Sequence, residues 1–150
     1  MSVNTTVSPC PAFAVNRLVT FAHVADVEAS LAFYSLLGFT PVHSMKDGSR
    51  RTFWARASSG AAEIMFAQAS APVDPRQQAV LFYMYTSDVA ALRAHLVSEG
   101  VADGGAYCGQ AGPNDGRRVV FNVARPHYMP AGELRVADPD GYCILVGQLQ

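Results

Sequence analysis

Residues 26–39 read DVEASLAFYSLLGF, and residues 88–101 read DVAALRAHLVSEGV. A shift of 62 positions aligns the two segments, so that both begin with Asp-Val and both carry a glycine one residue before the end. Internal similarity at so long a period indicates two copies of one supersecondary unit rather than a solenoid. The sequence therefore predicts a duplicated fold.

Each of the two segments has the pattern of a short helix. Asp26 and Asp88 occupy the position of an N-cap, where a carboxylate accepts the free amide hydrogens of the first turn. Apolar residues then recur at helical spacing. Gly38 and Gly100 follow at the position where a left-handed residue ends a helix. The pattern predicts two helices of about three turns.

Apolar runs on both sides of the predicted helices are typical of strands. They cover residues 18–23, 39–44, 51–57 and 62–68 in the first copy, and 80–85, 119–124, 133–137 and 142–148 in the second. Asp138-Pro139-Asp140-Gly141 is typical of a tight turn, with Pro second and Gly fourth. This order predicts an α+β fold in which two βαβββ modules form a curved mixed sheet around a cleft, with the helices outside.

The chain divides into four segments. We expect an N-terminal arm over residues 1–16, a first βαβββ module over 17–68, a linker over 69–78 and a second βαβββ module over 79–150. Prolines interrupt both the arm and the linker, as is usual outside regular elements. The 150 residues are 50% hydrophobic and 15% charged, which favours a compact core and excludes a disordered chain.

Charge and hydropathy exclude several classes of partner. Eleven basic residues against twelve acidic ones give a formal charge of −1, so we expect no nucleic acid partner. No apolar run approaches the roughly 18 residues of a membrane span, and the first 16 residues lack the Lys or Arg of a signal peptide. Cys10, Cys108 and Cys143 have unrelated spacings, typical of neither a disulfide framework nor a zinc site. These features predict a cytoplasmic protein.

Three motifs resemble the vicinal oxygen chelate superfamily, which contains glyoxalase I, extradiol dioxygenases and bleomycin-resistance proteins. They are Phe33-Tyr34, Leu37-Gly38-Phe39 and the Asp138–Tyr142 turn. The resemblance extends over about residues 18–149. It implies paired βαβββ modules around a ligand cavity, a small-molecule ligand and a homodimer.

Metal-dependent members of that superfamily place one metal ligand on the first strand of each module and another on the last strand. The resemblance carries these positions to Val19, Met65, Leu81 and Leu145. A divalent ion needs oxygen, imidazole or thiolate donors, which none of these side chains provides. We therefore expect no metal and no cofactor.

A displaced metal site built from His23, Glu63 and Cys143 is the alternative. Four residues along a strand span roughly 13 Å, which is too far for these groups to converge.

Residues two apart on a strand share a face, so the face that carries the metal in relatives can be assigned here. Its predicted ligand-binding residues are Phe21, His23, Trp54, Glu63, Tyr83, Tyr85 and Arg135. Tyr and Trp combine a large contact area with a polar group, although any one of these residues taken alone is more often an ordinary core residue. In the other register Phe53 replaces Trp54. Further polar candidates are Glu133, Tyr128 and His127, with Arg51 and Arg56 as weaker ones.

The sequence favours a metal-independent small-molecule-binding protein of the glyoxalase/bleomycin-resistance type, which holds an aromatic or apolar ligand for sequestration or transport. The first alternative is a metal-dependent lyase, isomerase or extradiol-type dioxygenase of the same superfamily. The second is a metal-free enzyme with His23 or Glu63 as general base. Whether the protein is an enzyme stays open at this point.

Overall fold

The computed structural model describes residues 14–108 and 116–150. Its two helices are α1 (Val27–Ser35) and α2 (Val89–Ser98). Both predicted N-caps are confirmed, because Asp26 accepts a hydrogen bond from the third residue after it at 3.1 Å and Asp88 does the same at 2.9 Å. The glycines after the helices have positive φ, +93° at Gly38 and +89° at Gly100, and therefore end both helices as predicted.

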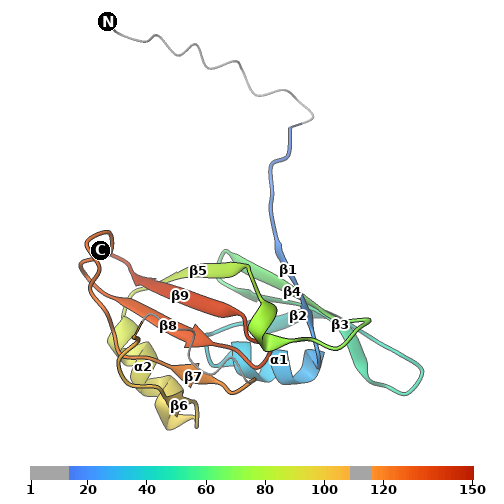
Figure 1. The fold of residues 1–150 in the computed structure, drawn as a ribbon. Helices are drawn as coiled ribbons and strands as arrows, with labels where there is room; N and C mark the ends of the chain where they lie inside the picture. The colour runs from blue at the N-terminus through green and yellow to red at the C-terminus, as the bar shows by residue number, and fades with distance from the viewer. Residues whose placement is uncertain (1–13, 109–115) are drawn as a thin grey trace, which may run out of the picture.

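The first module forms a four-stranded sheet (Figure 1). Its strands are β1 (Thr20–Val24), β2 (Thr40–Lys46), β3 (Thr52–Ser59) and β4 (Ala62–Gln68). They lie in the order β1-β4-β3-β2, with β1 parallel to β4 and the other pairs antiparallel.

The second module repeats this order with one strand more. Its sheet runs β5-β9-β8-β7-β6, formed by β5 (Leu81–Thr86), β6 (Ala102–Asp103), β7 (Val119–Val120), β8 (Glu133–Ala137) and β9 (Cys143–Gln148). A 3₁₀ turn, η1 (Pro75–Gln77), lies between the modules. The strand predicted over residues 119–124 is shorter than expected: β7 has two residues, and an isolated bridge at Ala124 follows. The short β6 was not predicted.

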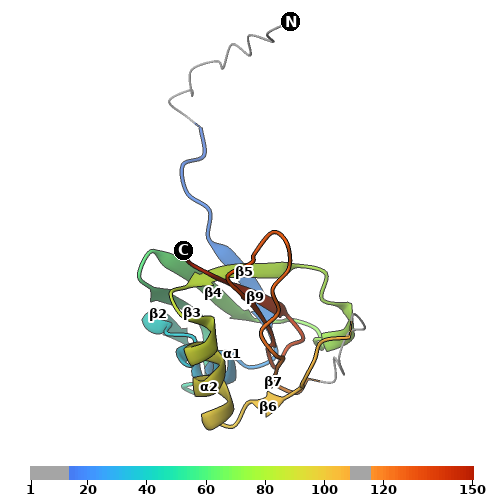
Figure 2. The ribbon, with the colours of Figure 1, turned by 90° about the vertical axis from the view of Figure 1, so that its left-hand side faces the viewer.

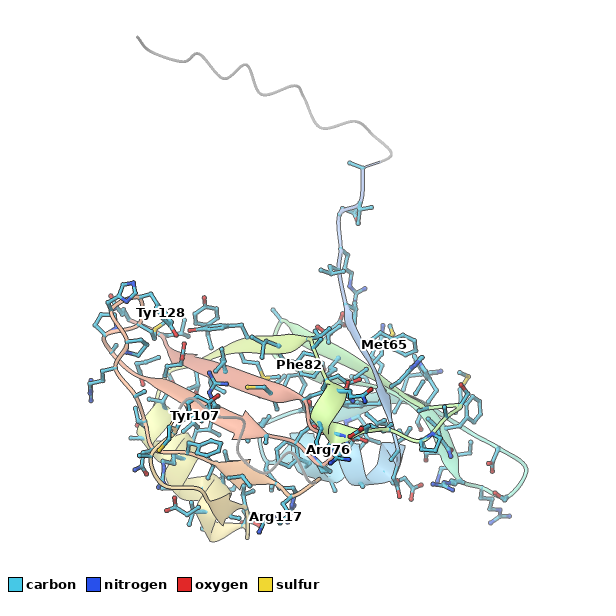
Figure 3. All side chains as sticks on the ribbon, viewed as in Figure 1. Met65, Arg76, Phe82, Tyr107, Arg117 and Tyr128 are labelled. Atoms are coloured by element: carbon cyan, nitrogen blue, oxygen red, sulfur yellow. The ribbon has the colours of Figure 1, made fainter. Side chains whose placement is uncertain are left out.

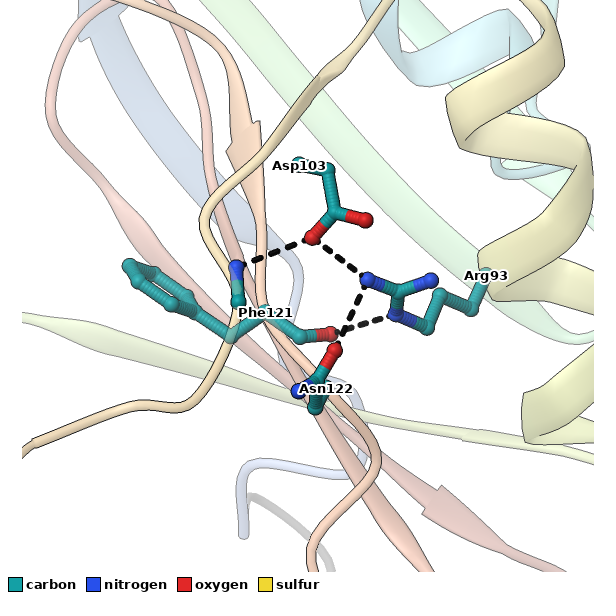
Figure 4. Close-up of polar contacts among 5 residues, drawn as sticks. Arg93, Asp103, Phe121 and Asn122 are labelled. Carbon is teal, nitrogen blue, oxygen red and sulfur yellow. Dashed lines mark hydrogen bonds and ion pairs between the residues drawn. The ribbon is translucent and has the colours of Figure 1, made fainter.

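Arg93 on α2 explains the irregular edge of the second sheet (Figure 4). Its guanidinium donates to the carbonyl oxygen of Phe121 at 3.0 Å, to the Asn122 amide oxygen at 2.9 Å and to the Asp103 carboxylate at 2.6 Å. Asp103 also accepts from the backbone N–H of Gly105 at 2.9 Å. Phe121 still donates from its N–H to the carbonyl oxygen of Arg135 on β8 at 3.0 Å, whereas its own carbonyl oxygen and the Asn122 amide oxygen are bound by the helix.

Both helices lie on the same side of the molecule, and each sheet has a face turned away from them (Figures 1 and 2). Along β1 and β4, alternate residues are buried toward the helices, as alternation in a strand requires, whereas every residue of β2 is exposed. The core so formed includes Val24, Ile64 and Phe66 of the first sheet and Leu134, Ile144 and Val146 of the second. Among the described residues, no helix is long and apolar enough to cross a membrane.

The Asp138–Gly141 turn holds the two modules together. It closes with a hydrogen bond from Gly141 N–H to the Asp138 carbonyl at 3.1 Å, as its sequence predicts. The Asp140 carboxylate accepts from the backbone N–H of Ala25, in the β1–α1 junction, at 2.8 Å. The neighbouring Tyr142 hydroxyl donates to the carbonyl oxygen of His23 at 2.9 Å. The turn of the second module thus binds the segment that leads into α1 of the first.

Candidate ligand-binding faces

The first sheet leaves one face uncovered by helices, which we call the first open face. It carries Phe21, His23, Trp54, Arg56, Glu63, Met65 and Ala67. The register places Trp54 on this face, opposite Ala67 of β4, whereas Thr52 lies on the helix side and donates from its hydroxyl to Glu28 of α1. The ring of Phe21, half exposed at 53%, lies edge-on to His23 with centroids 5.7 Å apart.

A small residue separates two rings on the first open face. Ala67 pairs with His23 on one side and with Trp54 on the other, so these two residues are two strand spacings apart, about 9.6 Å between backbones. The Trp54 ring also lies edge-on to the His43 ring of β2, with the two ring centroids 5.9 Å apart. We call the space above Ala67, between His23 and Trp54, the aromatic slot.

Glu63 lies on the same face, but its carboxylate is already bound by another residue. Its carboxylate forms an ion pair with Arg17, in the segment before β1. The hydrogen bond from Arg17 lowers the pKa of the Glu63 carboxyl. Glu63 also lies four residues along β4 from Ala67, or roughly 13 Å, so it is outside the aromatic slot.

The second sheet has an equivalent uncovered face, the second open face, which carries Leu81, Tyr83, Tyr85, Glu133, Arg135, Cys143, Leu145 and Gly147. Tyr83 and Tyr85 lie with ring centroids 5.3 Å apart and are 41% and 60% exposed. Buried Glu133 accepts hydrogen bonds from Tyr83 at 2.7 Å and from Tyr128 at 3.1 Å. Burial, and then the Glu133 hydrogen bond, raise the pKa of Tyr83.

Arg135 lies in the middle of the second open face. Its guanidinium is stacked 4.0 Å from the ring centre of Tyr107, and it donates to the sulfur of Cys143 at 3.2 Å. Figure 3 shows Tyr107 in front of the second sheet and Tyr128 at the end of it. Burial raises the pKa of the Cys143 thiol, and the nearby guanidinium opposes that shift.

The predicted site residues therefore fall into two groups. Phe21, His23, Trp54 and Glu63 lie on the first open face, and Tyr83, Tyr85 and Arg135 on the second. Arg56, one of the weaker candidates from the sequence, also lies on the first open face, where Ala67 was not a predicted site residue, and neither was Tyr107 on the second. The spacing of Arg56, two residues from Trp54, was the signal that placed it on the same face.

Cavities border these faces at the junction of the modules. One of about 540 Å³ is lined by Tyr83 and Tyr85 of β5 together with Leu37, Phe39, Leu92 and Val146. Another of about 410 Å³ lies between His23, Tyr142 and the segment from Ala69 to Gln78. Three of the predicted ligand residues, His23, Tyr83 and Tyr85, thus line these cavities.

The sequence matches the model of the Glyoxalase/Bleomycin resistance protein/Dioxygenase superfamily over residues 16–146. The chain belongs to this superfamily. No curated protein matches the sequence.

Solved structures share the superfamily fold with this chain. A bleomycin-binding protein in complex with bleomycin has a TM-score of 0.65 at 18% identity, covering 91% of this chain and 100% of that one. The bleomycin resistance determinant of transposon Tn5 gives 0.65 and 18%, with 91% and 99% covered. TnmS3, an antibiotic-binding protein from Streptomyces sp. CB03234, gives 0.55 and 16%, with 91% and 99% covered.

The positions to which the superfamily resemblance carries the metal ligands are Val19, Met65, Leu81 and Leu145. These side chains offer a single thioether as donor and do not fit a divalent ion, since hard or borderline ions prefer oxygen, imidazole or thiolate. Within residues 14–108 and 116–150, no group of three or more His, Cys, Asp or Glu side chains is placed to hold a metal ion. No reaction step is derived through a metal.

Proposed function

We propose that this superfamily member binds a small molecule with aromatic or apolar surface on its open faces, without a metal, and sequesters or carries it. The observation that supports the proposal most directly is the exposure of Phe21, Tyr83 and Tyr85 on sheet faces that no helix covers. Large exposed apolar side chains on such faces indicate an interaction site, since isolated monomers seldom leave large apolar surface open. Tyrosine and tryptophan add hydrogen-bonding groups to this apolar area.

The structural neighbours support the same conclusion. A bleomycin-binding protein and an antibiotic-binding protein share the fold over about nine-tenths of this chain. One fold serves many activities, so the open faces are the main support for binding. The neighbours show that proteins of this fold can hold a small molecule.

Binding is favoured over catalysis by Glu63, one of the two candidate general bases, because this carboxylate is poorly placed for the task. Arg17 engages the Glu63 carboxylate and lowers its pKa, which weakens it as a base. A general base must also reach the substrate proton within hydrogen-bonding distance, and Glu63 lies roughly 13 Å along the strand from the slot beside His23. The free thiols of Cys108 and Cys143 fit a reducing, cytoplasmic setting.

We also propose that the protein acts as a homodimer whose second copy covers part of the open faces. Leu81 on β5 is 57% exposed and Met45 on β2 is 44% exposed. Strands β1 and β5 each end a sheet and pair with one neighbour. A second copy would bury this apolar surface and form walls around the bound molecule.

The test is a screen of planar antibiotics and aromatic metabolites by fluorescence and thermal shift. Trp54 is the single tryptophan of the chain, so its emission reports on ligands at the first open face. Replacing Tyr83 and Tyr85 together by Ala is expected to weaken binding about tenfold to a hundredfold for ligands on the second open face. Val97→Ala, on the outer surface of α2, is the control. Unchanged affinity in a folded double variant would overturn the assignment of these tyrosines.

A further inference from the structure

Arg56 and Arg135 occupy equivalent positions in the two modules. Arg56 on β3 pairs with Met65 on β4, and Arg135 on β8 pairs with Leu145 on β9. Met65 and Leu145 are the last-strand positions that the superfamily resemblance assigns to metal ligands. A guanidinium therefore lies beside each of these positions, on the next strand of the sheet.

Arg56 has hydrogen-bonding capacity that the described residues do not use. Its Nε is buried and has no hydrogen-bond partner among them. Glu63, the carboxylate on the same face, is held by Arg17, and the charge of Arg56 also lowers the pKa of the Glu63 carboxyl. An unpartnered buried donor costs free energy, and a planar guanidinium matches carboxylates and other oxyanions in two-point contacts. This nitrogen lies below the surface, so an acceptor supplied by a ligand would satisfy it once the Arg56 side chain turns toward the open face.

The aromatic slot lies next to this guanidinium. Trp54 is two residues from Arg56 on β3, which corresponds to roughly 6.6 Å along the strand. A flat ring above Ala67, between His23 and Trp54, would therefore have Arg56 within reach of an acidic substituent.

The second open face is less suited to an anion. Arg135 has Glu133 two residues away on the same strand and face. The space above Gly147, equivalent to that above Ala67, is occupied: a Cβ built there would lie 2.8 Å from Met129 and 3.1 Å from the Tyr83 hydroxyl. Arg135 is also engaged by Tyr107 and Cys143.

We propose that the ligand of this protein is a planar aromatic anion, whose ring lies in the aromatic slot and whose acidic group binds Arg56. This inference rests on the proposed function and specifies the class of ligand. Arg56 supplies the positive charge at the position beside Met65, and Arg135 contributes less because of Glu133.

The experiment compares two fluorescent probes that share one ring system. 8-Anilinonaphthalene-1-sulfonate carries a sulfonate, and N-phenyl-1-naphthylamine is the same molecule without it. Both are titrated into the full-length protein and into Arg56→Gln, Arg56→Lys, Arg135→Gln and the control Arg50→Gln, which removes a charge from the exposed β2–β3 turn. Circular dichroism and the melting temperature verify the fold of each variant.

We expect the sulfonate probe to bind at least tenfold more tightly than the neutral one. Arg56→Gln should remove most of this preference, Arg56→Lys should restore part of it, and Arg135→Gln should weaken binding about threefold at most. Arg50→Gln should have no effect, and affinity for the neutral probe should stay constant throughout. These fold-changes correspond to loss of one charge-assisted contact.

The outcomes separate the inference from the proposed function. If both probes bind with equal affinity, the open face binds aromatic molecules and the anionic class is wrong. If the sulfonate preference survives Arg56→Gln, the assignment of Arg56 is wrong. If neither probe binds and the ligand screen is also negative, the proposed function fails as well.

Discussion

Tyr34 and Asp138 join the two modules through a buried hydrogen bond, in which the Tyr34 hydroxyl donates to Asp138 Oδ2 across 2.9 Å. Tyr34 belongs to α1 of the first module and is fully buried. Asp138 begins the turn before β9, and its other oxygen accepts from the backbone N–H groups of Asp140 and Tyr142, each at 2.9 Å. The carboxylate therefore ties its own turn to the helix of the other module.

Removing the Tyr34 hydroxyl should destabilise the fold. Tyr34→Phe keeps the ring but leaves a buried carboxylate oxygen without its donor, which costs about 1–3 kcal/mol. Urea unfolding followed by circular dichroism measures the loss. The matched control is Tyr85→Phe, an exposed tyrosine, which should change the free energy of unfolding by less than about 0.5 kcal/mol. Equal effects in the two variants would contradict the role assigned to Tyr34.

The same carboxyl should make stability depend on pH. Burial raises the pKa of Asp138 to about 7, against about 3.9 in an unfolded chain. Between these values the folded state keeps a proton that the unfolded state releases, so the free energy of unfolding falls as pH rises from about 4 to about 7. The slope is at most about 1.4 kcal/mol per pH unit for one group. Burial raises the pKa of Asp140 too, which acts in the same direction.

Asp138→Asn provides the test, since an amide does not titrate. Urea unfolding at pH 5, 6 and 7 should show a shallower slope for the variant than for the parent protein. Hydrogen bonds lower the pKa values of the exposed carboxyls Asp47, Glu63 and Asp103. These three carboxylates stabilise the folded state, and this contribution is lost only as pH falls through their folded-state pKa values. Those values lie below the range of pH 5 to 7 that is measured. A parent protein with a flat profile from pH 5 to 7 would refute the prediction.

Gly141 should tolerate no side chain, for two separable reasons. Its φ of +82° disfavours other residues, and a Cβ would lie 2.1 Å from the carbonyl oxygen of Pro75 in η1. Gly60 has a φ of +58° in the corresponding turn of the first module, with open space around it. Gly60→Ala should therefore cost about 1 kcal/mol from backbone strain alone, and Gly141→Ala clearly more. Similar melting temperatures for the two variants would show that Pro75 moves aside at little cost, and would contradict the second reason.

The features that the sequence predicted are those set by local chemistry. Asp26, Asp88 and Gly38 fix the ends of the helices through caps and a left-handed residue, which depend on a few neighbouring residues only. The turn beginning at Asp138 is likewise specified by its own four residues. Alternation along the strands then determined which side chains share a face, including Trp54 with Arg56.

The features that were missed depend on residues far apart in the chain. Glu63 is paired by Arg17, 46 residues away, and no local pattern indicates that contact. Strand β6 pairs with β7 while Arg93 on α2 binds Asp103, and no local pattern indicates either contact. The aromatic slot required the register of three strands, because Ala67 lies between His23 and Trp54 only after β1, β4 and β3 have paired.

Transition metals should not stabilise the protein. A specific site present at 100 times its Kd would add about 2.7 kcal/mol to the free energy of unfolding. We expect no such change with nickel, zinc, iron or manganese, because Val19, Met65, Leu81 and Leu145 lack suitable donors. Thermal shift of untagged protein, before and after treatment with a chelator, measures this. A rise in melting temperature that the chelator reverses would favour the metal-dependent enzyme instead.

The last prediction concerns assembly. Exposed apolar side chains on β5 and on the open faces are expected to be buried in an interface. A second copy of the chain can bury them, because a two-fold symmetric interface pairs the same surface of both copies. Sedimentation equilibrium at micromolar concentration should give a mass about twice the 16.0 kDa of one chain.

Leu81→Asp places a charge on the edge strand β5 and should shift the protein to monomer, whereas Val97→Asp on the exposed side of α2 should leave the dimer intact. Position 81 is exposed in the monomer, so Leu81→Asp should leave the fold intact, and circular dichroism verifies this. A parent protein that stays monomeric over a hundredfold range of concentration would rule out the dimer, and ligand binding would then be confined to the surfaces of a single chain.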